Sequence, residues 1–207
     1  MSENRMTMAR QWVNEFLAQP HIDLGREGDV CPFMARSVAA GHATFVSFDA
    51  REGHEALRAL VRDLRDDLEE RAENAGSWRA YLTAVIVPHG LPDDELVPLL
   101  YDVHTELKGE FVERGLMLGE FWPGHEVRGL HSDSFRPLDS PLPLLALRHM
   151  VLTDLAFLSG PHVPAEAQLT YLKHFRQVFG ESLTGSWPAR LENAEAAARR
   201  AYDAESV

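Results

Sequence analysis

The chain has 207 residues, of which 45% are hydrophobic and 25% are charged, a composition that excludes a disordered chain and suffices for one packed domain. Its formal net charge of -12 repels phosphate backbones and anionic lipid surfaces, so neither a nucleic acid nor a membrane is expected as a partner. Cys31 is the single cysteine, and no apolar run approaches the roughly 20 residues that span a bilayer. We therefore expect a single domain over residues 1–207 that works in the cytoplasm.

The first half of the chain predicts alternating helices and strands. Residues 1–20 form an N-terminal helix, because apolar residues recur at helical spacing up to Pro20. The residues from 21 to 32 are rich in Gly, Asp and Pro and are expected as a loop. There follow a β-rich run at 44–48, a helix over 53–73, a strand at 81–87 that is apolar on both faces, and a helix over 95–113.

The second half predicts a different arrangement. Short apolar runs at 116–122 and 144–151 are typical of strands joined without long helices. Helices return at 164–179 and 188–202, the latter within a C-terminal helical extension over 181–207. The whole pattern predicts an α+β fold, a single-domain α/β sandwich with a mixed sheet and helices packed on it. The strands at 81–87 and 144–151 should lie in the interior of that sheet.

Polar chemistry is concentrated in the loop before the last apolar run. Within eight residues, this loop holds His131, Ser132, Asp133, Ser134 and Arg136. One interpretation is a capped turn at the surface, and another is a binding loop at the rim of the sheet. His131 and Asp133 also match the His-x-Asp half of a two-histidine, one-carboxylate iron site.

Arg148 and His149 lie on the run 144–151, one on each apolar face of a regular strand. An unpartnered buried charge costs several kcal/mol, so both residues must have partners, emerge at the strand end or face a ligand. A satisfied core histidine is the alternative for His149. Cys31 is interpreted as a packing residue and not as a metal ligand, because no cluster of positive charge is evident to hold it as thiolate.

Three short motifs carry a resemblance: CPF at 31–33, GLHSDSFRP at 129–137 and RHM at 148–150. Their order resembles that of the haem-dependent amine and guanidine N-hydroxylases. The chain is more similar still to an uncharacterised bacterial family found beside natural-product genes, with a CPF and FRP-x-x-SP-x-P pattern. The sequence departs from the hydroxylase pattern at Ser132, Phe135 and Leu147–Arg148.

The resemblance implies a haem-binding protein, an oxygen-dependent N-hydroxylase of a small amine or guanidine in bacterial natural-product biosynthesis. It implies His131 as the axial iron ligand, Arg136 or Arg148 as the partner of a propionate, and His149 as the second histidine. These four residues should converge on one pocket, with His149 on the same side of the sheet as His131.

Two alternatives stay open. The first is a non-catalytic small-molecule-binding or accessory protein of a biosynthetic pathway, and the second is a non-haem iron oxygenase that uses His131 and Asp133. A homodimer is compatible with the sequence, which does not fix the oligomeric state.

Overall fold

A computed structural model describes residues 2–205 and shows a mixed α/β fold, which confirms the predicted fold class. Its contacts divide the chain into two compact units. The first comprises the residues up to Leu107 together with Leu118–His149, and the second comprises Lys108–Met117 and Met150 onward. Across residues 2–205, no helix is both long and apolar enough to cross a membrane.

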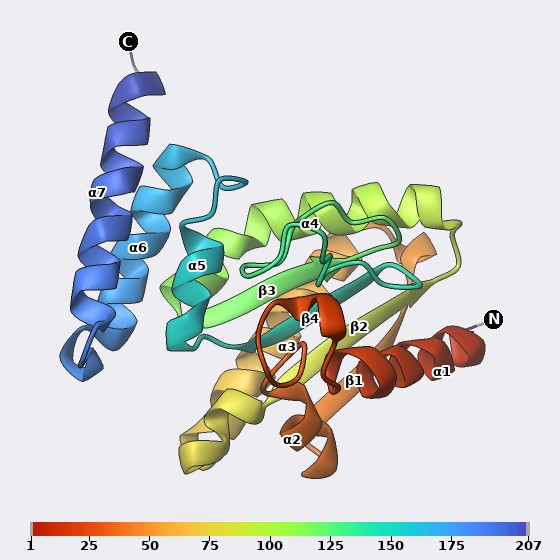
Figure 1. Cartoon of the computed structure of the whole chain (residues 1–207). Coiled ribbons are helices and arrows are strands. Elements are labelled where there is room, and N and C mark those ends of the chain that lie inside the picture. The colour runs from red at the N-terminus through yellow and green to blue at the C-terminus, as the bar shows by residue number, and fades with distance from the viewer. Residues whose placement is uncertain (1, 206–207) are drawn as a thin grey trace. The chain divides into compact units, whose positions relative to one another are not determined.

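The first unit is built on a four-stranded mixed sheet with strand order β1-β2-β4-β3 (Figure 1). The strands are β1 (Ala43–Asp49), β2 (Thr83–His89), β3 (Leu116–Phe121) and β4 (Leu144–His149). β1 pairs with β2 in parallel, with Phe45 opposite Val85, whereas β2 pairs with β4 antiparallel, with Val85 opposite Ala146. β2 and β4 are therefore interior strands, as predicted from their apolar sequences.

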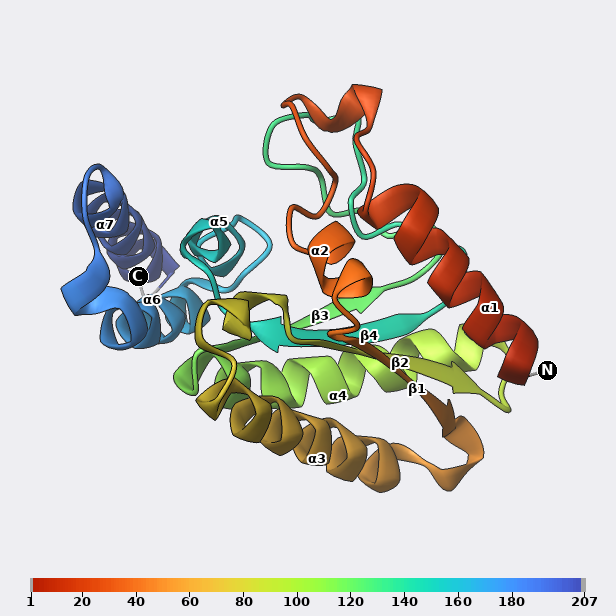
Figure 2. The ribbon, with the colours of Figure 1, turned by 90° about the horizontal axis from the view of Figure 1, so that it is seen from below.

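Helices cover both faces of this sheet (Figure 2). On one face lie α3 (His54–Glu73) and α4 (Asp93–Glu113), and on the other lie α1 (Ser2–Trp12) and α2 (Met34–Ala39). α4 contains Pro98 and buries an apolar stripe that includes Leu100, Val103 and Leu107. Short helical turns join these elements: η1 (Val13–Leu17), η2 (Ile22–Leu24), η3 (Ala50–Glu52) and η4 (Gly76–Tyr81).

The side chains of β4 alternate between the two faces of the sheet, as the pleat requires. Leu144 and Ala146 pack with Ala9 of α1 and with Val85 and Val87 of β2. Leu145, Leu147 and His149 point to the other face of the sheet, the face covered by α3, and are buried there. This division matches the two faces predicted from the sequence.

The second unit is helical over most of its length. It contains η5 (Leu152–Asp154), α5 (Leu155–Leu158), α6 (Ala165–Phe179), η6 (Gly180–Ser182) and α7 (Trp187–Glu205). α6 and α7 lie side by side (Figure 1) around Leu172, Phe175, Leu191 and Ala198, and the Arg176 guanidinium of α6 holds the Glu195 carboxylate of α7 through two hydrogen bonds. The helices predicted at 164–179 and 188–202 are thus confirmed to within a few residues.

Candidate functional site

The long loop between β3 and β4 carries most of the polar residues singled out in the sequence. Its two ends meet at its base, where the backbone N–H of Ser140 donates to the carbonyl oxygen of Trp122 at 3.3 Å. The Gly124 N–H donates to Oδ1 of Asp139 at 2.8 Å. Phe135 anchors the middle of the loop, because its ring is 4% exposed and packs with Leu17 and other apolar residues that follow α1. The loop is therefore held on the α1 face of the sheet.

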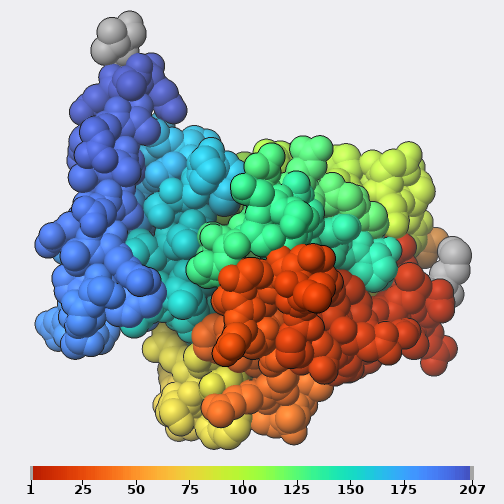
Figure 3. Space-filling model, viewed as in Figure 1, coloured from red at the N-terminus to blue at the C-terminus, as the bar shows by residue number. Residues whose placement is uncertain are grey.

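His131 lies exposed within this loop, next to the loop of residues 21–32. The N-terminal segment and the β3–β4 loop are neighbours in the space-filling view (Figure 3), and the rings of His21 and Phe135 lie 4.9 Å apart. Arg136 is partly buried, and its Nη1 donates to the carbonyl oxygens of Asp133 at 2.6 Å and Phe135 at 3.1 Å. Arg136 thus braces the loop that carries His131.

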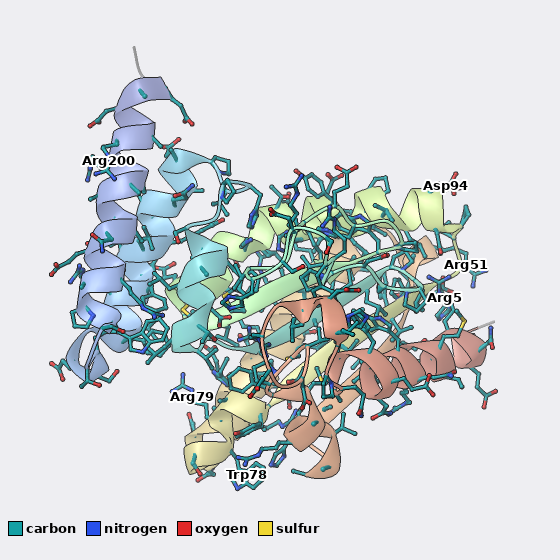
Figure 4. All side chains as sticks on the ribbon, viewed as in Figure 1. Arg5, Arg51, Trp78, Arg79, Asp94 and Arg200 are labelled. Atoms are coloured by element: carbon teal, nitrogen blue, oxygen red, sulfur yellow. The ribbon has the colours of Figure 1, made fainter. Side chains whose placement is uncertain are left out.

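His149 is 2% exposed, and both of its ring nitrogens have partners. Nε2 lies 3.1 Å from the carbonyl oxygen of Leu68 on α3, and Nδ1 accepts a hydrogen bond from Nε of Arg79, labelled in Figure 4, at 3.1 Å. Since Nδ1 accepts, the proton is on Nε2 and the ring is neutral. Burial lowers the pKa of His149, against the opposing effect of the Leu68 hydrogen bond. This geometry is that of a satisfied core histidine.

The predicted convergence of His131 with His149 is wrong. His149 faces α3, whereas the His131 loop is anchored through Phe135 on the α1 face. Arg148 is the residue of the pair that points to the α1 face, where its guanidinium lies 5.7 Å from the ring centre of Phe33. The strand pleat turns neighbouring side chains such as Arg148 and His149 to opposite faces of the sheet. The sequence does not indicate which of these two faces the His131 loop covers.

The expected haem site requires His131 and His149 to contact the same cofactor. A haem ligated by His131 could not also be contacted by His149, whose ring nitrogens are both engaged on the other face of the sheet. The four residues therefore do not fit one haem pocket. Asp133 is exposed, with Oδ1 3.5 Å from the Arg128 guanidinium. Within residues 2–205, no group of three His, Cys, Asp or Glu residues is arranged to hold a metal ion.

A buried cluster that the sequence reasoning missed lies at the start of the same loop. His104 of α4 places Nδ1 2.7 Å from Oε2 of Glu120 on β3, and its Nε2 lies 3.1 Å from the carbonyl oxygen of Leu118. Both ring nitrogens of His104 face oxygen atoms. His104, which is 7% exposed, thus joins α4 to β3 through two polar contacts.

His125 extends this cluster toward the surface. Its ring is 5% exposed and stacks on Trp122 with 4.2 Å between ring centres. Nδ1 accepts from the backbone N–H of Val127 at 3.3 Å, so a neutral ring carries its proton on Nε2. Nε2 is buried without a hydrogen-bond partner, and the Oε1 atom of Glu120 lies 3.9 Å away. His125 is therefore an imidazole with an unused donor.

A pocket of about 500 Å³ opens beside His125. Its lining residues all belong to the β3–β4 loop: Gly124, His125, Glu126, Arg128, Arg136 and Asp139. Two guanidinium groups and two carboxylates give this lining a formal charge of zero, and its size suits a small organic ligand. Of the four residues that the resemblance implied, Arg136 alone lines this pocket.

A sequence signal for the cluster exists, although it is weak. Glu120 shares a strand face with Leu116 and Leu118, which are both buried, and a carboxylate at such a position needs a buried partner. His104 likewise interrupts the apolar stripe of α4, one turn after Leu100. The irregular spacing of residues 104, 120 and 125 hides the cluster, because a helix, a strand and a loop each contribute one member.

Fold and site together define a mixed α/β protein with a ligand-sized pocket in its β3–β4 loop. The model of the family described as a domain of unknown function, DUF6875, matches residues 6–187. The chain therefore belongs to the DUF6875 family. No curated protein and no solved structure matches the chain.

Proposed function

We propose that this protein binds a small molecule in the pocket beside His125 and works in the cytoplasm. The observation that carries the proposal is the unused donor on His125 Nε2, in a ring that is 5% exposed and lines the pocket. A buried polar group without a partner costs about 1–3 kcal/mol, which an acceptor atom of a ligand would offset. The single cysteine and the absence of any disulfide in residues 2–205 suit a reducing compartment.

Of the three functions that the sequence left open, the small-molecule-binding protein has the most support. Its pocket is formed by one loop whose base is closed by the Trp122, Gly124 and Asp139 hydrogen bonds, so the lining residues are positioned before a ligand arrives. Haem-dependent N-hydroxylation rests on the sequence resemblance alone and stays a prediction. The iron oxygenase has less support, because both His131 and Asp133 lie exposed on the loop.

The indole N–H signal of Trp122 provides the test, since this ring stacks on His125. We would record two-dimensional ¹H–¹⁵N spectra of the full chain with mixtures of small metabolites of different charge. A ligand in the pocket should shift the Trp122 signal and leave the signal of Trp187, in the other unit, unchanged.

A matched pair of variants completes this test. His125→Phe keeps a ring stacked on Trp122 but removes the donor, whereas His174→Phe alters a partly exposed histidine of α6. We expect the first variant to weaken ligand binding at least about tenfold and the second to leave it unchanged. If no compound shifts Trp122, or if both variants bind equally, the pocket is not the functional site.

A further inference from the structure

Arg136 presents an unused hydrogen-bonding edge at the pocket. Its Nη1 atom is occupied by the carbonyl oxygens of Asp133 and Phe135, which fixes the plane of the guanidinium. Among residues 2–205, the Nε and Nη2 atoms of Arg136 have no hydrogen-bond partner, and no carboxylate forms an ion pair with the Arg136 guanidinium. Neither Nε nor Nη2 is buried. A residue that lines the pocket therefore has two parallel N–H donors without a partner.

The same edge of arginine binds carboxylates elsewhere in this chain. Arg176 uses Nε and Nη2 to hold the two carboxylate oxygens of Glu195 at 2.9 and 2.6 Å. Arg51 uses the same two atoms for the carboxylate of Asp49, with Nε at 2.8 Å from Oδ1. This fork matches the spacing of two carboxylate oxygens, and such charge-assisted pairs are stronger than neutral hydrogen bonds.

We infer that the pocket recognises a carboxylate group of its ligand, and that the Nε/Nη2 edge of Arg136 is the group that binds it. The inference rests on the proposed function, because it needs the pocket beside His125 to be the ligand site. The guanidinium of Arg128, whose Nη1 lies 3.5 Å from Oδ1 of Asp133, adds further N–H donors among the lining residues.

The charge balance of the lining favours a monoanion. Glu126 and Asp139 offset the two guanidinium groups, and Asp139 already accepts the Gly124 N–H through Oδ1. A phosphate dianion loses more hydration on entry than a monoanion does, and a lining without net charge does not offset that cost. The pocket should therefore discriminate a carboxylic acid from its uncharged amide and from inorganic phosphate.

Binding of benzoate and propionate to the full chain tests the inference, with benzamide, propionamide and inorganic phosphate as matched probes. We expect the two acids to shift the Trp122 indole signal and to bind at least about tenfold more tightly than their amides and than phosphate. Amides that bind as well as the acids would overturn the carboxylate inference while leaving the pocket as a ligand site. If no probe or metabolite shifts Trp122, the proposed function fails as well.

Substitutions of Arg136 separate recognition from loop bracing. Arg136→Lys keeps a positive charge but loses the fork, and Arg136→Gln keeps an N–H donor for the loop carbonyls but loses the charge. Arg26→Lys is the control, since Arg26 also braces a loop by donating to carbonyl oxygens, those of Glu27, Asp29 and Val30. We expect about 10- to 100-fold weaker acid binding in both Arg136 variants and no change in the Arg26 variant. Unchanged acid binding in a folded Arg136→Gln protein would contradict the inference.

Two sources of carboxylate can be distinguished in the same experiment. Haemin carries free propionates, whereas its dimethyl ester does not. Binding of haemin that depends on both its free propionates and Arg136 would support carboxylate recognition with haem as the source. Equal binding of haemin and its ester, without any response to the small acids, would refute the role of Arg136.

Discussion

Gly25 approaches the backbone of His131 so closely that a Cβ atom at Gly25 would lie 2.2 Å from the His131 carbonyl oxygen. Gly25 also has a φ of +75°, in the left-handed region that favours glycine. The loop of residues 21–32 therefore packs backbone against backbone on the loop that carries His131 and Arg136. Only glycine satisfies both requirements at this position.

Gly25→Ala should consequently lower the free energy of unfolding by about 2–4 kcal/mol, the sum of backbone strain and steric overlap. Gly28→Ala is the matched control, because Gly28 has a φ of +90° but its Cβ would meet only the Nη1 atom of Arg26, at 3.5 Å. The control should cost about 1–2 kcal/mol for strain alone. Urea denaturation measures both variants, and equal losses would show that the contact with His131 is unimportant for stability.

His149 predicts a specific pH dependence of stability. Its pKa is lowered in the folded chain by burial, so below its unfolded pKa of about 6.5 the unfolded state binds a proton that the folded state does not. This stability is fully present above pH 6.5 and is lost as the pH falls toward the folded pKa. The slope from one such group is at most about 1.4 kcal/mol per pH unit.

His149→Leu should remove this slope between pH 6.5 and 5, in urea denaturation series at constant ionic strength. His174→Leu, which removes a partly exposed histidine of α6, should keep the slope. A wild-type slope that persists in the His149 variant would mean that another group titrates in this range and that His149 is not the neutral core histidine described above.

The pair of His104 and Glu120 predicts a large effect of a single substitution. Glu120→Ala leaves the buried His104 ring without the carboxylate that lies 2.7 Å from Nδ1, and removing one partner of a buried pair costs about 3–5 kcal/mol. Glu15→Ala, which removes an exposed carboxylate paired with Gln11, should change stability by less than about 0.5 kcal/mol. Chemical denaturation compares them, and similar losses would contradict the buried pair.

Most of the elements could be predicted from the sequence, because apolar residues recur with the period of a helix or a strand. The stripe of α4 and the fully apolar β2 illustrate this, and the two faces of β4 follow from the alternation of Leu145, Leu147 and His149 against Arg148. Local periodicity decides such features, since it reflects which side of one element is buried.

The site could be predicted only in part. The residues around His131 and Arg136 form a loop between two strands, as their turn residues indicate, but the position of this loop on the α1 face depends on the packing of Phe135 with residues that follow α1, a contact between distant parts of the chain. The cluster of His104, Glu120 and His125 depends in the same way on α4, β3 and the loop meeting in space. The spacing of residues within one segment does not indicate which other segments that segment contacts.

The haem prediction is decided by absorption spectra of protein expressed with a haem precursor. The resemblance predicts a Soret band that His131→Ala abolishes or shifts, because an exposed imidazole at 131 is free to ligate iron.

The geometry predicts that His149→Leu leaves the band unchanged, because Nε2 and Nδ1 of His149 are engaged by Leu68 and Arg79 on the other face of the sheet. His174→Ala is the control, because it removes a partly exposed histidine of α6, far along the chain from the β3–β4 loop. A band that is lost in the His149 variant would require the α3 face to open for the cofactor, against the hydrogen bonds described here. A band that survives His131→Ala would remove His131 as the ligand, and a colourless protein that also refuses added haemin would leave the small-molecule pocket at His125 as the functional site.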